Sequence, residues 1–135
     1  MTYLVEANVL SEPTKPAPVA KVLEWLRRNE VEIAVDPIIV GEIRFGIDRM
    51  PPGRRRQRFE RWFDQGVVNL VCLPIEAATG IRWAKLLARL RAAGDAMPFK
   101  DSVIAATALV YGLTVATRNT RDFQKAGVKV IDPFT

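Results

Sequence analysis

Acidic and amide side chains recur directly after apolar runs along this sequence. Glu6 and Asn8 follow one such run near the N-terminus, and Asn119 and Asp122 follow another near the C-terminus. Carboxylate and amide oxygens are the ligands that hard divalent cations such as Mg²⁺ and Mn²⁺ prefer. A cation held in this way keeps water positions and can direct a bound water at a phosphodiester. The residue types therefore point to metal-dependent phosphodiester hydrolysis.

Two more carboxylates stand beside predicted helices. Asp101 precedes the apolar segment Ser102–Tyr111, and Glu42 lies next to Ile43 in a stripe of isoleucines spaced four residues apart. A carboxylate close to buried surface is costly unless it is paired or bound to a metal. The same residue types also have structural uses, because Asp and Asn cap helices and form turns, and Glu42 can pair with Arg44.

The sequence contains no histidine and a single cysteine, Cys72. Ser-His-Asp triads, Cys-His dyads and histidine-ligated zinc are therefore excluded, as are an internal disulfide and a multi-cysteine metal cluster. Any catalysis depends on carboxylates, lysines or hydroxyls. Cys72 lies in an apolar run, which predicts a small, buried side chain.

Strand-like and helix-like segments alternate along the 135 residues, whose length fits a single domain, 1–135. The apolar runs predicted as strands are Tyr3–Val5, Val31–Val35, Val67–Leu73, Leu113–Thr117 and Val128–Ile131. The segments with helical spacing or helix-end residues are Val19–Arg28, Pro37–Ile47, Glu76–Ala93 and Ser102–Tyr111. Such alternation builds a parallel sheet covered on both faces. Ligands bind these sheets beyond the carboxyl ends of the strands, where the acidic residues are expected.

Positive charge is concentrated in one segment. Five arginines and one glutamate lie between Arg54 and Arg61, so this segment carries +4 of the net charge of +5. A second basic stripe, at helical spacing, consists of Arg82, Lys85 and Arg89. Both features indicate a polyanionic partner such as nucleic acid or an acidic protein, although a solvated helix face produces the same pattern.

The remaining apolar residues are expected to form a core rather than a membrane segment. No stretch approaches the about 20 apolar residues that a membrane span needs, and the N-terminus lacks the layout of a signal peptide. A cytoplasmic location without membrane contact is therefore expected. On the side of the helix opposite the second basic stripe, four residues are predicted to pack inward: Ile81, Ala84, Leu87 and Ala88.

Four motifs in this sequence resemble those of PIN-domain ribonucleases. Val5–Glu12 reads VEANVLSE, where that family usually begins with LDTNVLSE, and residues 41–47 (GEIRFGI) look like the second acidic motif. Residues 98–108 (PFKDSVIAATA) and 117–123 (TRNTRDF) look like the third and fourth. The order and spacing match over essentially the whole chain, and the nearest resemblance is to VapC/FitB-type toxins of toxin–antitoxin pairs.

This resemblance implies a three-layer α/β/α fold with a central parallel sheet of four to five strands. It also implies an endoribonuclease that depends on Mg²⁺ or Mn²⁺, cleaves tRNA, rRNA or mRNA, and is inhibited by a cognate antitoxin. Toxins of this type usually form homodimers or larger toxin–antitoxin assemblies.

The resemblance also assigns roles to particular residues. The positions implied to be catalytic are Glu6, Glu42, Asp101, Asn119 and Asp122. Those implied to hold the metal are Glu6, Asp101, Asn119 and Asp122, with Asn8 and Thr117 orienting them. The basic residues expected to contact RNA are Arg54, Arg55, Arg56, Arg58, Arg82, Lys85, Arg89 and Arg118.

Two residues depart from the family pattern. Glu6 replaces the usual aspartate and Ala7 replaces the usual threonine. The extra methylene displaces the carboxylate by about a bond length, whereas metal sites tolerate errors of only about 0.2 Å in ligand distance. Two hypotheses follow: an active metal-dependent toxin, or a catalytically weakened module that binds antitoxin and RNA without efficient cleavage.

Overall fold

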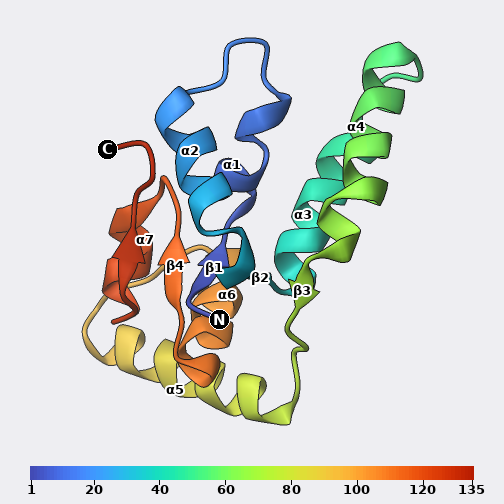
Figure 1. Cartoon of the computed structure of the whole chain (residues 1–135). Coiled ribbons are helices and arrows are strands. Elements are labelled where there is room, and N and C mark those ends of the chain that lie inside the picture. The colour runs from blue at the N-terminus through green and yellow to red at the C-terminus, as the bar shows by residue number, and fades with distance from the viewer.

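Five short parallel strands form the centre of the computed structural model, which describes residues 1–135 (Figure 1). The strands are β1 (Tyr3–Val5), β2 (Ile33–Val35), β3 (Val71–Cys72), β4 (Thr114–Ala116) and β5 (Val130–Ile131). Their order across the sheet is β3-β2-β1-β4-β5. In the central strand, Leu4 pairs with Ala34 on one side and with Val115 on the other, and all three are completely buried. Uniformly apolar strands are expected where both faces of a sheet are covered.

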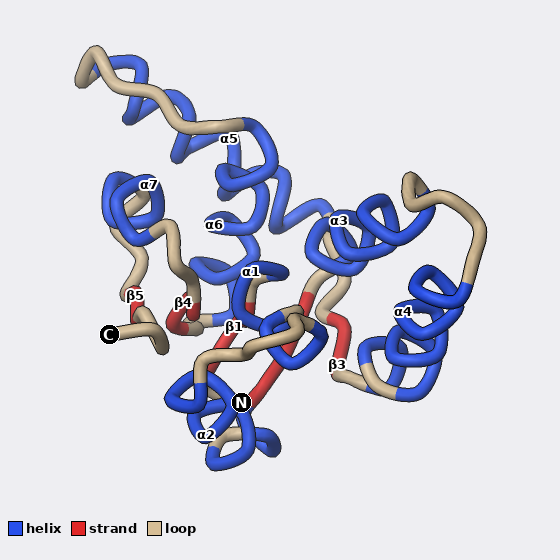
Figure 2. Tube along the Cα trace, turned by 90° about the horizontal axis from the view of Figure 1, so that it is seen from above, coloured by secondary structure: helices blue, strands red, loops and turns tan.

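Helices cover the two faces of this sheet. They are α1 (Ala7–Leu10), α2 (Ala20–Arg28), α3 (Pro37–Asp48), α4 (Arg54–Gln65), α5 (Ala77–Ala92), α6 (Phe99–Tyr111) and α7 (Thr120–Lys125). Seen from above, α2 lies on one side of the strands, and α6 lies on the other with α5 outside it (Figure 2). This arrangement confirms the predicted three-layer fold. No helix combines the length and the apolar character that crossing a bilayer requires.

The arginine-rich segment forms α4, which pairs with α3 in a hairpin that projects from the body (Figure 1). Arg44 holds the two helices together, because its guanidinium contacts Asp48 at 2.9 Å and Glu60 at 3.4 Å. Arg56 closes the tip by donating to the backbone oxygen of Met50 at 3.1 Å. Part of the positive charge in this segment therefore stabilises the hairpin.

The start of α3 is tied to α6 by a buried carboxylate. Asp36 caps the helix, since its Oδ1 accepts from the backbone N–H of Ile39 at 2.9 Å. Its Oδ2 accepts from the hydroxyl of Thr107 at 2.7 Å. Pro37 at the first helical position has no N–H to satisfy, which suits the start of a helix.

Two predictions about side-chain burial are wrong. Cys72 is exposed, because β3 is a two-residue strand at the edge of the sheet and nothing covers it. On α5, Ile81 is 61% exposed, and Ala84 and Ala88 are also exposed. The helix instead buries Leu86 and Leu90, on the face that packs against α6.

Candidate active site

The first acidic residue is placed by the pairing of β1 with β4. Val5 lies opposite Ala116, and the backbone N–H of Glu6 donates to the Ala116 oxygen at 3.0 Å. Glu6 and Thr117 therefore leave the sheet side by side. The Thr117 hydroxyl donates to Oε1 of Glu6 at 2.5 Å, and both side chains are buried.

Thr117 connects Glu6 to the loop after β4. Its Oγ1 accepts from the backbone N–H of Asn119 at 2.9 Å and lies 3.5 Å from Nδ2 of Asn8. The Oδ1 of Asn8 accepts from the backbone N–H of Arg118 at 3.2 Å. Asn8 and Thr117 thus lie beside Glu6 and hold the two strand ends together.

Asn119 joins two further carboxylates. One Nδ2 atom donates to Oδ2 of Asp101 at 3.1 Å and to Oδ2 of Asp122 at 3.0 Å. Asp101 comes from the first turn of α6 and Asp122 from the first turn of α7. An uncharged amide therefore lies between two carboxylates that would otherwise face each other directly.

Glu42 reaches the same region from α3, and its partner is a lysine that sequence reasoning missed. Nζ of Lys100 lies 3.1 Å from Oε2 of Glu42, whereas Arg44 pairs elsewhere. The signal that could have identified Lys100 was its position directly before Asp101, on the same turn of helix.

The positive charges near these acidic side chains do not balance their negative charges. Burial raises the pKa of Glu6 to about 7, despite the hydrogen bond from Thr117, and the negative charges of Asp101 and Glu42 add to the rise. The pKa of Asp101 is also raised, first by burial and then by the charges of Asp122 and Glu42. A cation placed among these groups would reverse both effects, because it stabilises the ionised forms.

The donor set fits a divalent cation in its chemistry, although no three acidic side chains are gathered as a metal-ligand group. The oxygens of Asp101 and Asp122 both face the Asn119 amide, which orders them around a common neighbour. Only hard oxygen donors are present, as Mg²⁺ and Mn²⁺ prefer. Ligation by all of them requires rotation of side chains.

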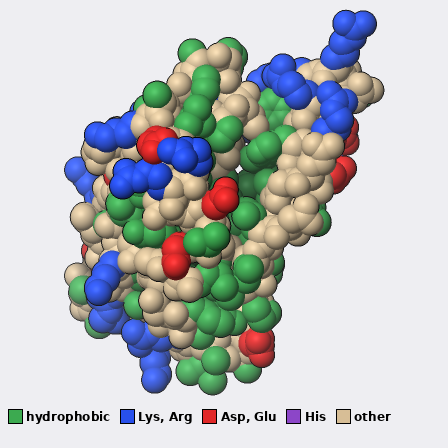
Figure 3. Space-filling model, in the orientation of Figure 1, with side chains coloured by type: hydrophobic (Ala, Val, Ile, Leu, Met, Phe, Trp, Pro, Cys, Tyr) green, Lys and Arg blue, Asp and Glu red, His purple; other side chains and the backbone are tan.

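The basic residues singled out in the sequence lie in three places. Arg54, Arg55, Arg56 and Arg58 are on α4, and basic side chains gather at the hairpin tip (Figure 3). Arg82, Lys85 and Arg89 are on α5, which runs low in Figure 1, whereas Glu6 and Asn119 follow the upper ends of β1 and β4. The guanidinium of Arg118 stacks on the ring of Phe134 at 4.3 Å. Of these sets, the hairpin adjoins a groove that is lined by one of the site carboxylates, Glu42.

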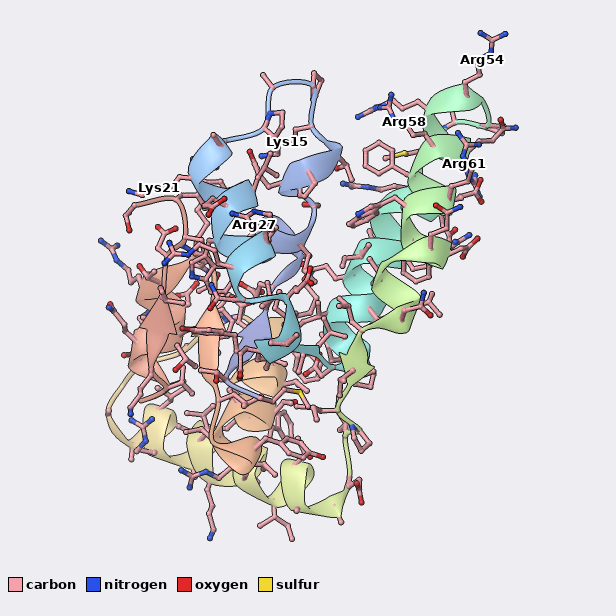
Figure 4. All side chains as sticks on the ribbon, viewed as in Figure 1. Lys15, Lys21, Arg27, Arg54, Arg58 and Arg61 are labelled. Carbon is pink, nitrogen blue, oxygen red and sulfur yellow. The ribbon has the colours of Figure 1, made fainter.

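That groove has a volume of about 330 Å³ and separates α1 from the hairpin, with Glu42 at one end and Phe59 and Trp62 at the other. Phe59 and Trp62 also line a second pocket of about 380 Å³, which includes Lys15 and Arg58. In Figure 4, Arg58 points from α4 toward the loop that carries Lys15, whereas Arg54 points into solvent.

The chain matches a known family of protein domains. Residues 3–129 match the family model described as PIN domain. The chain belongs to the PIN-domain family. The carboxylates of this PIN domain lie beyond the strand ends, as expected for a parallel sheet.

Curated relatives share almost the full length of this PIN domain. Plasmid stability protein StbB of Pseudomonas syringae pv. tomato is 40% identical, and the match covers 97% of each chain. VapC ribonuclease Y4jK of Sinorhizobium fredii is 34% identical, covering 97% of this chain and 96% of the relative. Toxin FitB of Neisseria gonorrhoeae is 31% identical, with 97% coverage of both chains.

A solved structure agrees with the fold. The crystal structure of FitAcB from Neisseria gonorrhoeae superposes with a TM-score of 0.92 at 31% identity, covering 98% of this chain and 99% of that chain. The three-layer arrangement of this PIN domain is therefore shared along its whole length.

Proposed function

We propose that this PIN domain is a metal-dependent endoribonuclease and the toxin of a toxin–antitoxin pair. The observation that carries the proposal is the convergence of Glu6, Glu42 and the Asp101–Asn119–Asp122 group at one edge of the sheet. The names of two relatives, a VapC ribonuclease and the toxin FitB, support it.

Glu6, Asp101, Asn119 and Asp122 would hold Mg²⁺ or Mn²⁺, which on binding activates water and offsets charge on the phosphate. Thr117 keeps the Glu6 carboxylate in place through its 2.5 Å hydrogen bond. Hydrolysis adds water across the P–O3′ bond: hydroxide is added to phosphorus and a proton to O3′. The products are a 5′-phosphate and a 3′-hydroxyl.

RNA contact is proposed for the exposed arginines of the hairpin. Arg54 and Arg58 are free of ion pairs with carboxylates, whereas Arg56 lies 3.7 Å from Asp48 and 3.8 Å from Glu60. Arg58 lines the pocket that continues into the groove toward Glu42. Lys and Arg near an RNA backbone increase affinity in a salt-dependent way.

An antitoxin segment is proposed to occupy the groove between α1 and the hairpin, because a peptide there covers Glu42 and excludes RNA. Gly46 lines this groove, and a Cβ atom added at that position meets no neighbouring atom within 4 Å. Gly46→Leu should therefore place an uncharged side chain in the groove without disturbing the fold. We expect it to abolish binding of the cognate antitoxin and to leave Mn²⁺ binding unchanged.

The decisive experiment is cleavage of total RNA by the purified chain without antitoxin, in Mn²⁺, in Mg²⁺ and in EDTA. We expect fragments that disappear in EDTA and fall at least about 100-fold with Asp101→Asn, since the carboxylate is lost without a change in shape. Asp64→Asn is the matched control, because Asp64 is exposed on α4 and makes no ion pair. Light scattering on the same samples tests the proposed homodimer.

The variant Glu6→Asp separates this proposal from the weakened-module alternative. Cleavage by the natural chain would show that Glu6 serves as a metal ligand. Cleavage by Glu6→Asp alone identifies an intact site weakened by one methylene. If neither chain cleaves but both retain RNA in a gel-shift assay, the binding-module alternative is correct and the nuclease proposal is wrong.

A further inference from the structure

Lys100 is the cation that lies closest to the acidic side chains of the proposed site. Its Nζ is 3.1 Å from Oε2 of Glu42, although the two residues are 58 positions apart and come from α6 and α3. Arg44, two residues after Glu42, is fully engaged with Asp48 and Glu60. The chain therefore provides a specific partner for Glu42 across a helix interface.

Lys100 also acts on the neighbouring carboxylate. Its charge lowers the pKa of Asp101, in opposition to burial and to the charges of Asp122 and Glu42. The other nearby lysine, Lys125, pairs with Asp95 at 3.4 Å and Asp122 at 3.8 Å and forms no ion pair with Glu42. Lys100 thus pairs directly with Glu42, and its charge also stabilises the ionised form of Asp101. A second divalent cation bound by these two carboxylates would compete with Lys100 for the same negative charges.

We propose that the Lys100 ammonium group serves as the second cation of this site, so that the chain binds one divalent ion instead of two. This inference rests on the proposed metal-dependent function and specifies its metal stoichiometry. One divalent ion together with Lys100 and Lys125 supplies four positive charges for the carboxylates of Glu6, Glu42, Asp101 and Asp122. Glu42 is then neutralised by the protein itself, while Asp101 and Asp122 remain available to the ion.

Replacement of Lys100 is expected to leave the fold intact. Its side chain is 60% exposed and the Glu42 side chain 31% exposed, so the ion pair lies at the mouth of the site and not in the core. Surface ion pairs contribute little to stability. We therefore expect Lys100 to affect the binding of divalent ions rather than the stability of the fold.

The test is Mn²⁺ binding, measured by the loss of the free-ion signal in electron paramagnetic resonance as each chain is titrated. We expect one Mn²⁺ per natural chain and two per Lys100→Met chain. Lys21→Met is the matched control, because Lys21 lies on α2, on a different element from the site residues, and forms no ion pair (Figure 4). It should bind one ion, as should the double variant Lys100→Met/Glu42→Gln. Circular dichroism confirms that each variant is folded.

Two results would overturn the inference while leaving the proposed function intact. One is two Mn²⁺ per natural chain, and the other is an unchanged single ion of unchanged affinity in Lys100→Met. Absence of Mn²⁺ binding by every chain would contradict both the inference and the proposed metal dependence.

Discussion

Glu6 and Asp36 occupy equivalent places in neighbouring parts of the sheet. Glu6 directly follows β1 and precedes α1, and Asp36 directly follows β2 and precedes α3. Their side chains are almost completely inaccessible, with 4% exposure for Glu6 and 0% for Asp36. Burial is the main cause of a raised pKa in both. Position and burial alone therefore do not distinguish them.

Their surroundings do distinguish them. Both oxygens of Asp36 accept hydrogen bonds, one from the Ile39 N–H and one from the Thr107 hydroxyl. Glu6 accepts one from Thr117 and faces the charges of Asp101 and Glu42, whereas on Asp36 the charge of Glu42 is the smallest of the effects and no other carboxylate acts. Asp36 is therefore a helix cap that fixes α3 to α6, whereas Glu6 carries charge that its neighbours oppose. A buried carboxylate with complete hydrogen bonding stabilises the fold, and one facing other carboxylates is available for chemistry.

The largest predicted effect is on stability. Asp36→Ala should lower the free energy of unfolding by about 4 kcal/mol, because it removes a cap and leaves the Ile39 N–H and the Thr107 hydroxyl without their acceptor. Asp36→Asn should recover most of this loss, since the Asn side chain also caps helices. Urea unfolding at pH 8 in EDTA measures both.

Glu6→Ala provides the contrast. It removes a buried charge that Asp101 and Glu42 destabilise, so it should lower the free energy of unfolding by much less than Asp36→Ala. Equal losses in the two alanine variants would show that Glu6 is also a structural carboxylate, and the distinction would be wrong.

The second prediction concerns pH. The pKa of Glu6 is about 7 in the folded chain and 4.5 for the unperturbed group, so between these values the folded state binds more protons than the unfolded state. The free energy of unfolding should therefore fall as pH rises from about 4.5 to 7, by at most about 3 kcal/mol, and then level off. Asp36, with its raised pKa, contributes in the same direction from lower pH. Urea unfolding from pH 5 to 8 in EDTA measures the slope.

Glu6→Gln is the control for this slope. The amide does not titrate, so most of the fall between pH 5 and 7 should disappear in this variant, while the contribution of Asp36 remains. An unchanged slope would mean that the Glu6 carboxyl titrates near its usual value.

Much of the fold and of the acidic edge that contains Glu6 could be predicted from the sequence. Short apolar runs followed by Glu6 and Asn119 were enough to predict parallel strands and an acidic edge, because the crossover rule constrains where strand ends lie. Asp36 also directly follows an apolar run, but the sequence alone does not indicate its role. Its role depends on Thr107, which is 71 residues away and belongs to another helix. Local pattern cannot reveal a partner that only packing supplies.

The wrong predictions also arise because the sequence does not show which residues become neighbours in the fold. The strand predicted over Val67–Leu73 is reduced to Val71–Cys72, and Cys72 is exposed, because the run lies at an uncovered edge of the sheet. The partner of Glu42 was sought nearby at Arg44 but is Lys100 on α6. Apolar composition predicts that a segment can be buried, whereas the identity of its neighbours is a property of the assembled fold.

A smaller loss of stability is expected at Thr107, whose hydroxyl donates a hydrogen bond to Asp36. Thr107→Val keeps the shape of the side chain but leaves Oδ2 of Asp36 without a donor. The free energy of unfolding should fall by about 1.5 to 3 kcal/mol, the usual effect of losing one hydrogen bond to a charged group. RNA cleavage at saturating metal should stay unchanged. A loss of cleavage without a loss of stability would place Asp36 in the active site.

The smallest effect is on the pKa of Glu6 and comes from the corresponding threonine, Thr117. The hydrogen bond from Thr117 lowers the pKa of Glu6, so Thr117→Val should raise that pKa above about 7. The variant also removes the acceptor of the Asn119 N–H, so some stability should be lost at every pH. Carbon-13 NMR of the Glu6 carboxyl, titrated in EDTA, reports the pKa directly. Because the hydroxyl holds the ionised form, the variant should also need a higher pH to bind Mn²⁺. A Glu6 pKa that is unchanged in Thr117→Val would show that burial and the neighbouring carboxylates set it, and the hydrogen bond would then position the carboxyl without changing its pKa.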